Sequence, residues 1–263
     1  MILDELAAYS KLRVKQAKRQ ISFSEIQTQA LQLPKGTFRL EQTLAQKSIS
    51  FICEVKKASP SKGIIADNFP YVSIAKEYEA AGADAISVLT EPKWFLGSDQ
   101  YLKEIRANVS LPILRKYFTV DSYQIYEAKL LGADAVLLIC AILDTDTIRN
   151  SIQICDELGM SALVETHDEN EIVSAINAGA RIIGVNNRNL KNFTVNFENC
   201  TTLRKYIPDN ILFVAESGVK TADDVALIAA SGANAILIGE TLMRSNQKKE
   251  LLDSFHQAAK REL

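Results

Sequence analysis

Charged and amide side chains end five short apolar runs in this sequence, and they are the residues best suited to chemistry. They are Glu54 and Lys56 after the first run, then Lys116, Glu165, Asn186 and Glu216. Lysine and glutamate can exchange protons near neutral pH when burial and neighbouring charges shift their pKa values. A single lysine or glutamate at a strand end is usually a solvated surface residue, so the inference depends on all five runs. With only two histidines in the chain, we expect lysine and glutamate to carry the proton transfers.

The elements that must position these residues alternate along the chain. Apolar runs of four to six residues cover 51–55, 85–89, 112–115, 135–139, 161–165, 181–186, 211–216 and 235–239. Longer segments with helical spacing lie between them, at 71–82, 121–132, 145–159, 168–179 and 221–232. Such alternation is typical of a parallel sheet covered by helices on both faces.

Four similar motifs support a repeated strand-and-helix unit. They are GADAISVL (82–89), GADAVLLI (132–139), GARIIGVN (179–186) and GANAILIG (232–239). Eight such units in a chain of this length predict an α/β fold, a (β/α)8 TIM barrel with its active site at the carboxyl ends of the strands. A doubly wound open sheet is the alternative, but the chain has neither GxGxxG after the first strand nor GxxxxGK[ST] anywhere.

Residues 1 to about 45 precede the first strand and predict a helical extension of one domain covering 1–263. Two helices are expected, at about 2–19 and 22–31, followed by the helix breakers Pro34 and Gly36. The first helix has an apolar stripe and a basic face. We expect it to pack on the barrel, and a helix that binds a membrane surface or a partner is the alternative.

Glycines after the last two strands indicate a phosphate site. Gly218 follows Glu216 and Ser217, and Gly239 precedes Glu240. The loops after strands 7 and 8 of such barrels commonly bind phosphate through backbone N–H groups, and Lys56 or Ser59 could add a side-chain donor. A tight turn would explain either glycine alone, but the pair favours a phosphate ester.

Composition excludes several classes of function. Thirty basic and 32 acidic residues leave a formal charge of −2, which argues against a general electrostatic binder of nucleic acid or membranes. No apolar run is long enough to cross a bilayer, and the charged N-terminus lacks a signal-peptide core, so a cytoplasmic location is expected. The four cysteines form no CxxC pair, and we expect reduced thiols and no metal site.

Seven motifs in order resemble the indole-3-glycerol-phosphate synthase family of tryptophan biosynthesis. They are FICEVKKASPSKG (51–63), LTEPKWFLGSDQYL (89–102), PILRKYFTVDSYQI (112–125), LVETHDENEI (163–172), IIGVNNRNLKNFTVN (182–196), VAESGVKTADDV (214–225) and AILIGETLM (235–243). The resemblance begins at the N-terminal helix and covers nearly the whole chain. It implies a cofactor-free enzyme that closes, decarboxylates and dehydrates 1-(2-carboxyphenylamino)-1-deoxyribulose 5-phosphate.

The resemblance also implies roles for individual residues. Lys116 matches a general acid, Glu165 its acid–base partner in dehydration, and Lys56 a group that engages the substrate carboxylate. Which lysine acts in which step stays open. Orienting roles fall to Glu54, Asn186 and Glu216, pocket positions to Ser217 and Arg188, and the aromatic wall to Phe95 and Phe118. The phosphate positions are Ser59, Gly218, Gly239 and Glu240, with Glu240 expected to bind through its backbone and to turn its side chain away.

One position departs from the family pattern. The family commonly has Lys-Asp-Phe on the third strand, and this chain has Lys116, Tyr117 and Phe118. Strand alternation predicts that Tyr117 faces away from Lys116, so activity should survive. If the missing aspartate tunes the lysine, however, the rate or pH optimum would differ from that of the family.

Other phosphate-binding barrels remain as alternatives. A phosphoribosylanthranilate isomerase or a tryptophan synthase α subunit would not need this set of lysines and glutamates together. A catalytically silent barrel should have lost at least one of the matched positions. We expect the partner to be a small phosphorylated substrate, not nucleic acid or a membrane, and the chain to be a monomer.

Overall fold

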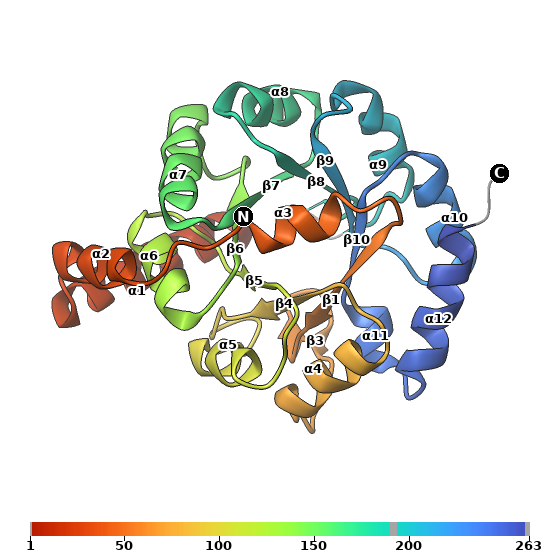
Figure 1. The fold of residues 1–263 in the computed structure, drawn as a ribbon, viewed down its shortest axis with the longest axis horizontal. Helices are drawn as coiled ribbons and strands as arrows, with labels where there is room; N and C mark the ends of the chain where they lie inside the picture. The colour runs from red at the N-terminus through yellow and green to blue at the C-terminus, as the bar shows by residue number, and fades with distance from the viewer. Residues whose placement is uncertain (1, 190–193, 261–263) are drawn as a thin grey trace.

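Eight parallel strands form a closed barrel in the computed structural model, which describes residues 2–189 and 194–260 (Figure 1). The strands follow one another around the barrel in chain order, and β1 pairs with both β4 and β10. They are β1 (Ser50–Val55), β4 (Ala85–Leu89), β5 (Ile113–Lys116), β6 (Ala135–Ile139), β7 (Ser161–Thr166), β8 (Ile182–Asn186), β9 (Leu212–Glu216) and β10 (Ala235–Ile238). The predicted (β/α)8 barrel is confirmed.

Helices surround the barrel (Figure 1). They are α4 (Tyr71–Ala80), α5 (Asp99–Arg106), α6 (Tyr123–Leu131), α7 (Thr145–Leu158), α8 (Glu169–Ala178), α9 (Glu198–Leu203) with the 3-10 turn η1 (Arg204–Tyr206), α10 (Ala222–Ala230), α11 (Glu240–Arg244) and α12 (Lys248–Ala259). Side chains of Ser98, Asp144, Asp168 and Thr221 accept backbone N–H groups at helix starts. These caps satisfy donors that the first helical turn leaves free, which is why the helices begin there.

Three helices precede the barrel, where two were predicted: α1 (Ile2–Gln20), α2 (Phe23–Gln32) and α3 (Arg39–Leu44). In Figure 1, α3 lies across the barrel. Leu40 and Leu44 are fully buried in the same apolar cluster as the interior side chains Ile52 and Leu114. The extra helix was missed because six residues are too few to show a helical period.

The segment before α3 is held against the end of α7 by direct backbone contact. The Gly36 N–H donates to the carbonyl of Leu158 at 2.9 Å, and the Phe38 N–H donates to the carbonyl of Gly159 at 3.1 Å. A Cβ atom at Gly36 would overlap the carbonyl oxygen of Gly159. Glycine is therefore required where the two backbones touch.

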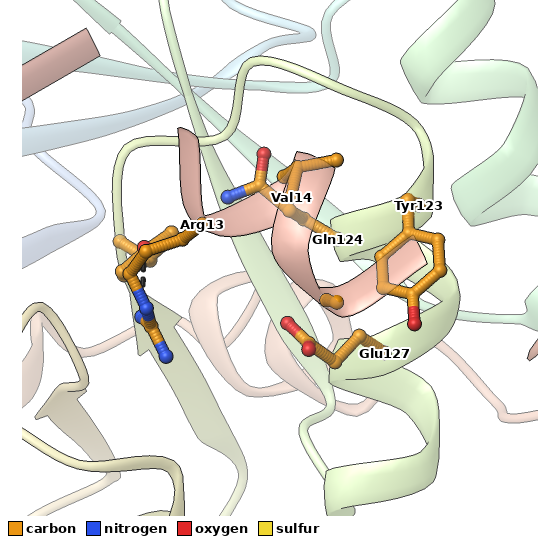
Figure 2. A pocket seen from close by; sticks show the side chains of 7 residues that line it. Arg13, Val14, Tyr123, Gln124 and Glu127 are labelled. Carbon is orange, nitrogen blue, oxygen red and sulfur yellow. Dashed lines mark hydrogen bonds between the residues drawn. The ribbon is translucent and has the colours of Figure 1, made fainter. Parts of the chain in front are cut away.

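Helix α1 packs on the segment that follows β5. Ser10 Oγ donates to the carbonyl of Phe118 at 2.6 Å, and Lys18 forms an ion pair with Asp121 at 2.7 Å. Arg13 and Val14 of α1 and Glu127 of α6 line a cavity of about 20 Å³, and Figure 2 shows these side chains. These contacts confirm the packed-helix interpretation. No helix in residues 2–189 and 194–260 combines the length and apolar character that a membrane span requires.

A small hairpin, which was not predicted, follows β1. It consists of β2 (Ala58–Ser59) paired antiparallel with β3 (Gly63–Ile64). The Ala58 N–H also donates to the carbonyl of Phe95 at 3.2 Å, which joins the hairpin to the loop after β4. The first and second loops are thus linked above the barrel.

Candidate active site

A cavity of about 950 Å³ lies at the carboxyl ends of the barrel strands. All fourteen residues singled out in the sequence line it: Glu54, Lys56, Ser59, Phe95, Lys116, Phe118, Glu165, Asn186, Arg188, Glu216, Ser217, Gly218, Gly239 and Glu240. Eight strands of a barrel converge at this end, so residues far apart in the chain become neighbours. Their chemical roles stay predictions.

Lys116 lies between two buried carboxylates. Its Nζ donates to Glu216 Oε2 at 2.6 Å and lies 3.5 Å from Glu165 Oε2. The side chains of Glu165 and Glu216 are 3% and 1% exposed, so water screens these charges poorly. Burial alone lowers the pKa of Lys116, but attraction to Glu216, Glu165 and Glu54 outweighs burial and raises this pKa above its usual value. The lysine therefore holds its proton until a reacting group takes it.

The two carboxylates around Lys116 differ in acidity. Burial raises the pKa of Glu216 to about 7, despite the attraction of Lys116, and repulsion from Glu165 adds to the rise. Glu216 Oε1 is buried and has no hydrogen-bond partner among the described residues. Burial also opposes ionisation of Glu165, but Lys116, His167 and a hydrogen bond from Asn186 together lower its pKa. Near pH 7, Glu165 is therefore ionised, whereas Glu216 is protonated in part of the molecules.

A second pair on β1 faces the same cavity. Lys56 Nζ contacts Glu54 Oε1 at 2.5 Å. A Cβ atom at position 239 would overlap Glu54 Oε1 and lie 2.8 Å from Lys56 Nζ, so Gly239 leaves the space that this pair fills. Gly184 on β8 does the same for Glu216 Oε1. Gly184 was not predicted, although a glycine inside an apolar strand run is a signal of close approach.

Asn186 connects β7 to the loop after β8. Its Nδ2 donates to Glu165 Oε1 at 3.1 Å, and its Oδ1 accepts the backbone N–H of Arg188 at 3.0 Å. The amide therefore orients one carboxylate oxygen while it fixes the backbone at Arg188. Residues 190–193 of the matched motif at 182–196 lie outside the described residues.

Two phenylalanines form an apolar wall. The rings of Phe95 and Phe118 lie 6.0 Å apart between centroids, at 41°. The Phe95 loop is held by Glu91, which is 1% exposed and accepts the backbone N–H groups of Lys93, Trp94 and Phe95. Trp94 packs edge-on against Tyr9 of α1 at 5.5 Å and does not belong to the cavity wall. Glu91 is a further residue that sequence reasoning missed.

Beside β9 and β10 the cavity is lined by Ser217, Gly218, Gly239 and Glu240, which were predicted to bind the substrate. Ser217 and Gly218 both have positive φ, 66° and 97°, a conformation rare for serine. This turn follows β9 directly. The side chain of Glu240 pairs with Lys62 at 3.5 Å and with Arg244 at 3.1 Å. Glu240 is therefore neutralised by two cations at the mouth of the cavity.

Known proteins match this chain over a range that includes all of these site residues. The family model described as indole-3-glycerol phosphate synthase matches residues 3–255. The chain belongs to the indole-3-glycerol phosphate synthase family. A synthase of that name from Ruminiclostridium cellulolyticum is 60% identical over 246 residues, which cover 93% of this chain and 95% of the relative. One from Lacticaseibacillus casei is 53% identical over 98% of this chain and 100% of its own.

Solved structures show the same fold at much lower identity. A 3-hexulose-6-phosphate synthase from Salmonella typhimurium matches with a TM-score of 0.66 and 15% identity, covering 80% of this chain and 98% of that one. A thiamine phosphate pyrophosphorylase from Pyrococcus furiosus matches with a TM-score of 0.61 and 14% identity, over 84% and 97% of the two chains. These likenesses support the barrel architecture alone.

Tyr117, the departure from the common family pattern, turns away from Lys116. Its hydroxyl bonds Arg13 of α1 at 2.8 Å, and its ring lies 5.1 Å from the guanidinium carbon of Arg115. Burial raises the pKa of the Tyr117 hydroxyl, so the group stays neutral. Its hydroxyl joins α1 to the end of β5 and does not point to the cluster of Lys116, Glu165 and Glu216, as alternation along the strand predicted.

His167 was not among the predicted site residues, yet it lies beside Glu165. Its Nε2 is 3.4 Å from Glu165 Oε1, and its Nδ1 is 3.1 Å from Glu171 Oε2. The available signal was its place two residues after Glu165, which puts both on one side of an extended chain. It was not predicted because, with only two histidines in the chain, the proton transfers were expected from lysine and glutamate.

Proposed function

We propose that this chain converts 1-(2-carboxyphenylamino)-1-deoxyribulose 5-phosphate to indole-3-glycerol phosphate, carbon dioxide and water, as a carboxy-lyase of its family. The observation that carries the proposal is the position of Lys116 between Glu165 and Glu216 in a cavity that also holds Lys56. A firmly protonated lysine beside two carboxylates of different acidity can supply and remove protons at neighbouring atoms.

The cavity suits the three parts of this substrate. Phe95 and Phe118 would contact the aromatic ring, and Lys56 would pair with its carboxylate. The backbone N–H groups at Gly218 and Gly239, with Ser59 and Ser217, would hold the phosphate. Glu240 already pairs with Lys62 and Arg244, which removes its charge from the path of the dianion.

Ring closure uses Lys116 as the general acid. The ring carbon that bears the carboxylate attacks the ketone carbon, and the ketone oxygen takes the lysine proton as the new carbon–carbon bond forms. The bond to the carboxylate then breaks, carbon dioxide leaves, and its electron pair restores the aromatic ring. The apolar wall favours this loss because it replaces water around the carboxylate.

Dehydration completes the indole. The new hydroxyl takes a second proton and leaves as water, while the adjacent carbon gives up one proton to form the carbon–carbon double bond. Glu165, whose pKa is lowered, is suited to accept that proton. Asn186 orients Glu165, and Glu216 orients Lys116. Glu54 orients Lys56 in the same way.

We also propose a cytoplasmic monomer in which residues 1–263 form one domain. The four cysteines are free thiols, as expected in a reducing compartment. The extension is joined to the barrel by α3 and by the contacts of α1. Light scattering from the purified chain would test the monomer, since a dimer would double the measured mass.

The test is to incubate the purified chain with the carboxyphenylamino-deoxyribulose phosphate and follow the fluorescent indole product. Lys116→Ala should reduce the rate by about 10²–10⁴-fold, the range of a lost general acid. The control is Lys103→Ala, an exposed lysine on α5, which should leave the rate unchanged. Absence of product from the unmodified chain, under conditions in which it is folded, would refute the proposal.

A further inference from the structure

The proposed reaction takes up one proton from solvent in each turnover. The substrate loses its carboxylate as neutral carbon dioxide. The ketone oxygen takes two protons before it leaves as water, and the adjacent carbon returns only one. Since the phosphate does not change, one proton must enter the site. This balance rests on the proposed function and on the release of carbon dioxide itself.

Direct entry of that proton is hindered by burial. The side chains of Glu165 and Glu216 are almost completely buried, and that of Lys116 is 14% exposed. A bound substrate would cover the cavity side of these groups. Resupply therefore needs a group that touches the cluster and is itself open to water from another direction.

His167 meets this requirement. Its imidazole lies between Glu165 at the end of β7 and Glu171 in the first turn of α8, at 3.4 Å and 3.1 Å. Glu171 Oε2 also accepts the backbone N–H of His167 at 2.8 Å, which holds this carboxylate next to the Nδ1 side of the ring. Nε2 is shielded from solvent and has no hydrogen-bond partner among the described residues, whereas the whole side chains of His167 and Glu171 are 17% and 20% exposed and do not line the cavity that the substrate would fill. One nitrogen thus faces the cluster and the other faces an accessible carboxylate.

We propose that His167 is a proton-relay residue that acts through Glu165. Nε2 lies 3.4 Å from Glu165 Oε1 without a hydrogen bond, so the ring must close this gap to pass its Nε2–H to Glu165, which then reloads Lys116 at 3.5 Å. The ring regains a proton from water or buffer acid on the Glu171 side. No other co-reactant is needed, because the proton that enters is the one that the balance requires.

The charges around His167 favour the protonated ring. Burial lowers its pKa, but the hydrogen bond to Glu171 and the charges of Glu165, Glu171 and Glu216 outweigh burial and raise it. Lys116 is the cation that faces the same carboxylates. Cys140, after β6, approaches the carbonyl of Glu171, and burial raises the pKa of its thiol to about 12, so it stays neutral. Asp168 caps α8 on the backbone N–H of Glu171.

The first test compares His167→Asn with His256→Asn, since the chain has only these two histidines. His256 lies on α12, where its Nε2 contacts the carbonyl of Gly82. Steady-state rates over many turnovers are measured, because a proton already held in the site could serve the first turnover. At pH 8 we expect the His167 variant to react about 10-fold more slowly, with KM within twofold. Added imidazole should restore its rate and leave the control unaffected.

The second test compares Glu171→Gln with Glu169→Gln, an exposed neighbour on the same helix. Loss of the Glu171 charge should lower the pKa of His167, seen by NMR titration of the two histidines, and move the alkaline decline in rate to lower pH by the same amount. The Glu169 variant should leave both unchanged.

Three results would overturn the relay. They are a His167→Asn rate within twofold of the unmodified chain at every pH, a loss that imidazole does not restore, and a Glu171 variant whose pH profile does not follow the histidine. Failure of the proposed function would look different, because the unmodified chain would then form no product.

Discussion

One lysine sets the charge state of the cluster formed by Lys116, Glu165 and Glu216. Lys116 faces two carboxylates that would otherwise repel each other in a region that water hardly reaches. Its pairing is tight with Glu216 and loose with Glu165, yet Glu216 has the higher pKa, because burial raises the pKa of Glu216 whereas His167 and Asn186 join Lys116 in lowering that of Glu165. Different acidity in one small space is what acid and base steps require.

Because Glu216 has a raised pKa in the folded state, the stability of the folded protein should decrease as the pH rises. Its unfolded carboxyl loses its proton above a pKa of 4.5, whereas the folded one keeps it until about pH 7. The folded state binds more protons between these values, so the free energy of unfolding falls from about pH 5 to pH 7. Glu216→Gln imitates the neutral acid and lacks this fall.

We therefore expect Glu216→Gln to be about 2 kcal/mol more stable than the unmodified chain at pH 8, and about equal at pH 5. Its activity should fall at least 10-fold, because Lys116 loses its close partner. Urea unfolding at both pH values checks the stability. Equal stability differences at pH 5 and pH 8 would show that Glu216 does not carry a raised pKa.

At the scale of elements, alternation along each strand decides which residues reach the cavity. Lys116 and its neighbour Tyr117 leave β5 in opposite directions, one toward the carboxylates and the other toward Arg13 of α1. The aromatic substitution at the common aspartate position therefore changes how α1 is attached and leaves the cluster as it is.

Tyr117→Asp should leave the pH profile of the reaction unchanged. The new carboxylate would face Arg13 and Arg115, both of which lie near the tyrosine ring, and the chain would lose the hydroxyl contact with α1. The check is the rate as a function of pH for the variant and the unmodified chain. A shift in the optimum would mean that position 117 tunes Lys116 after all.

Helix α3 should contribute strongly to stability through two leucines. Leu40 and Leu44 are fully buried against the barrel interior, so Leu44→Ala removes packed methyl groups and leaves a cavity. We expect a loss of about 3 kcal/mol in the free energy of unfolding. The control is Leu31→Ala on α2, where the side chain is 44% exposed and the loss should stay below about 0.5 kcal/mol. A similar loss in both variants would mean that α3 does not close the barrel.

At the scale of the whole molecule, an ion network around the buried Arg115 joins the extension, strand β5 and two outer helices. The guanidinium of Arg115 on β5 bonds Asp99 of α5 at 2.6 Å and Glu127 of α6 at 2.7 Å. Asp99 also pairs with Arg13 of α1 at 3.4 Å. Strand β5, which carries Lys116, is thus tied to three helices at once.

Arg115→Met should lower stability by about 3 kcal/mol, because it removes the cation and leaves two carboxylates facing each other. Arg149→Met, which breaks an exposed pair with Asp146, should change stability by less than about 0.5 kcal/mol. Denaturant midpoints measure both. A single unfolding transition in each protein would support one domain, whereas separate transitions for the extension and the barrel would contradict it.

The sequence by itself determined the barrel and the order of its parts. Apolar strands covered by helices on both faces and glycines at helix ends are local patterns, and each depends on residues only a few positions apart. The strand-end residues could be assigned to one mouth because barrel topology and alternation follow from the same patterns.

Tertiary structure alone decided what long-range contacts create. The different acidity of Glu165 and Glu216 depends on distances between three strands, and the space for Glu54 depends on Gly239 nearly 200 residues away in the chain. Helix α3 was not predicted because packing against the barrel stabilises it, and its six residues show no helical period. The position of His167 depends on its contacts with Glu171, four residues further along the chain, and with Glu165. Charge and burial act through space, and the sequence records spacing only along the chain.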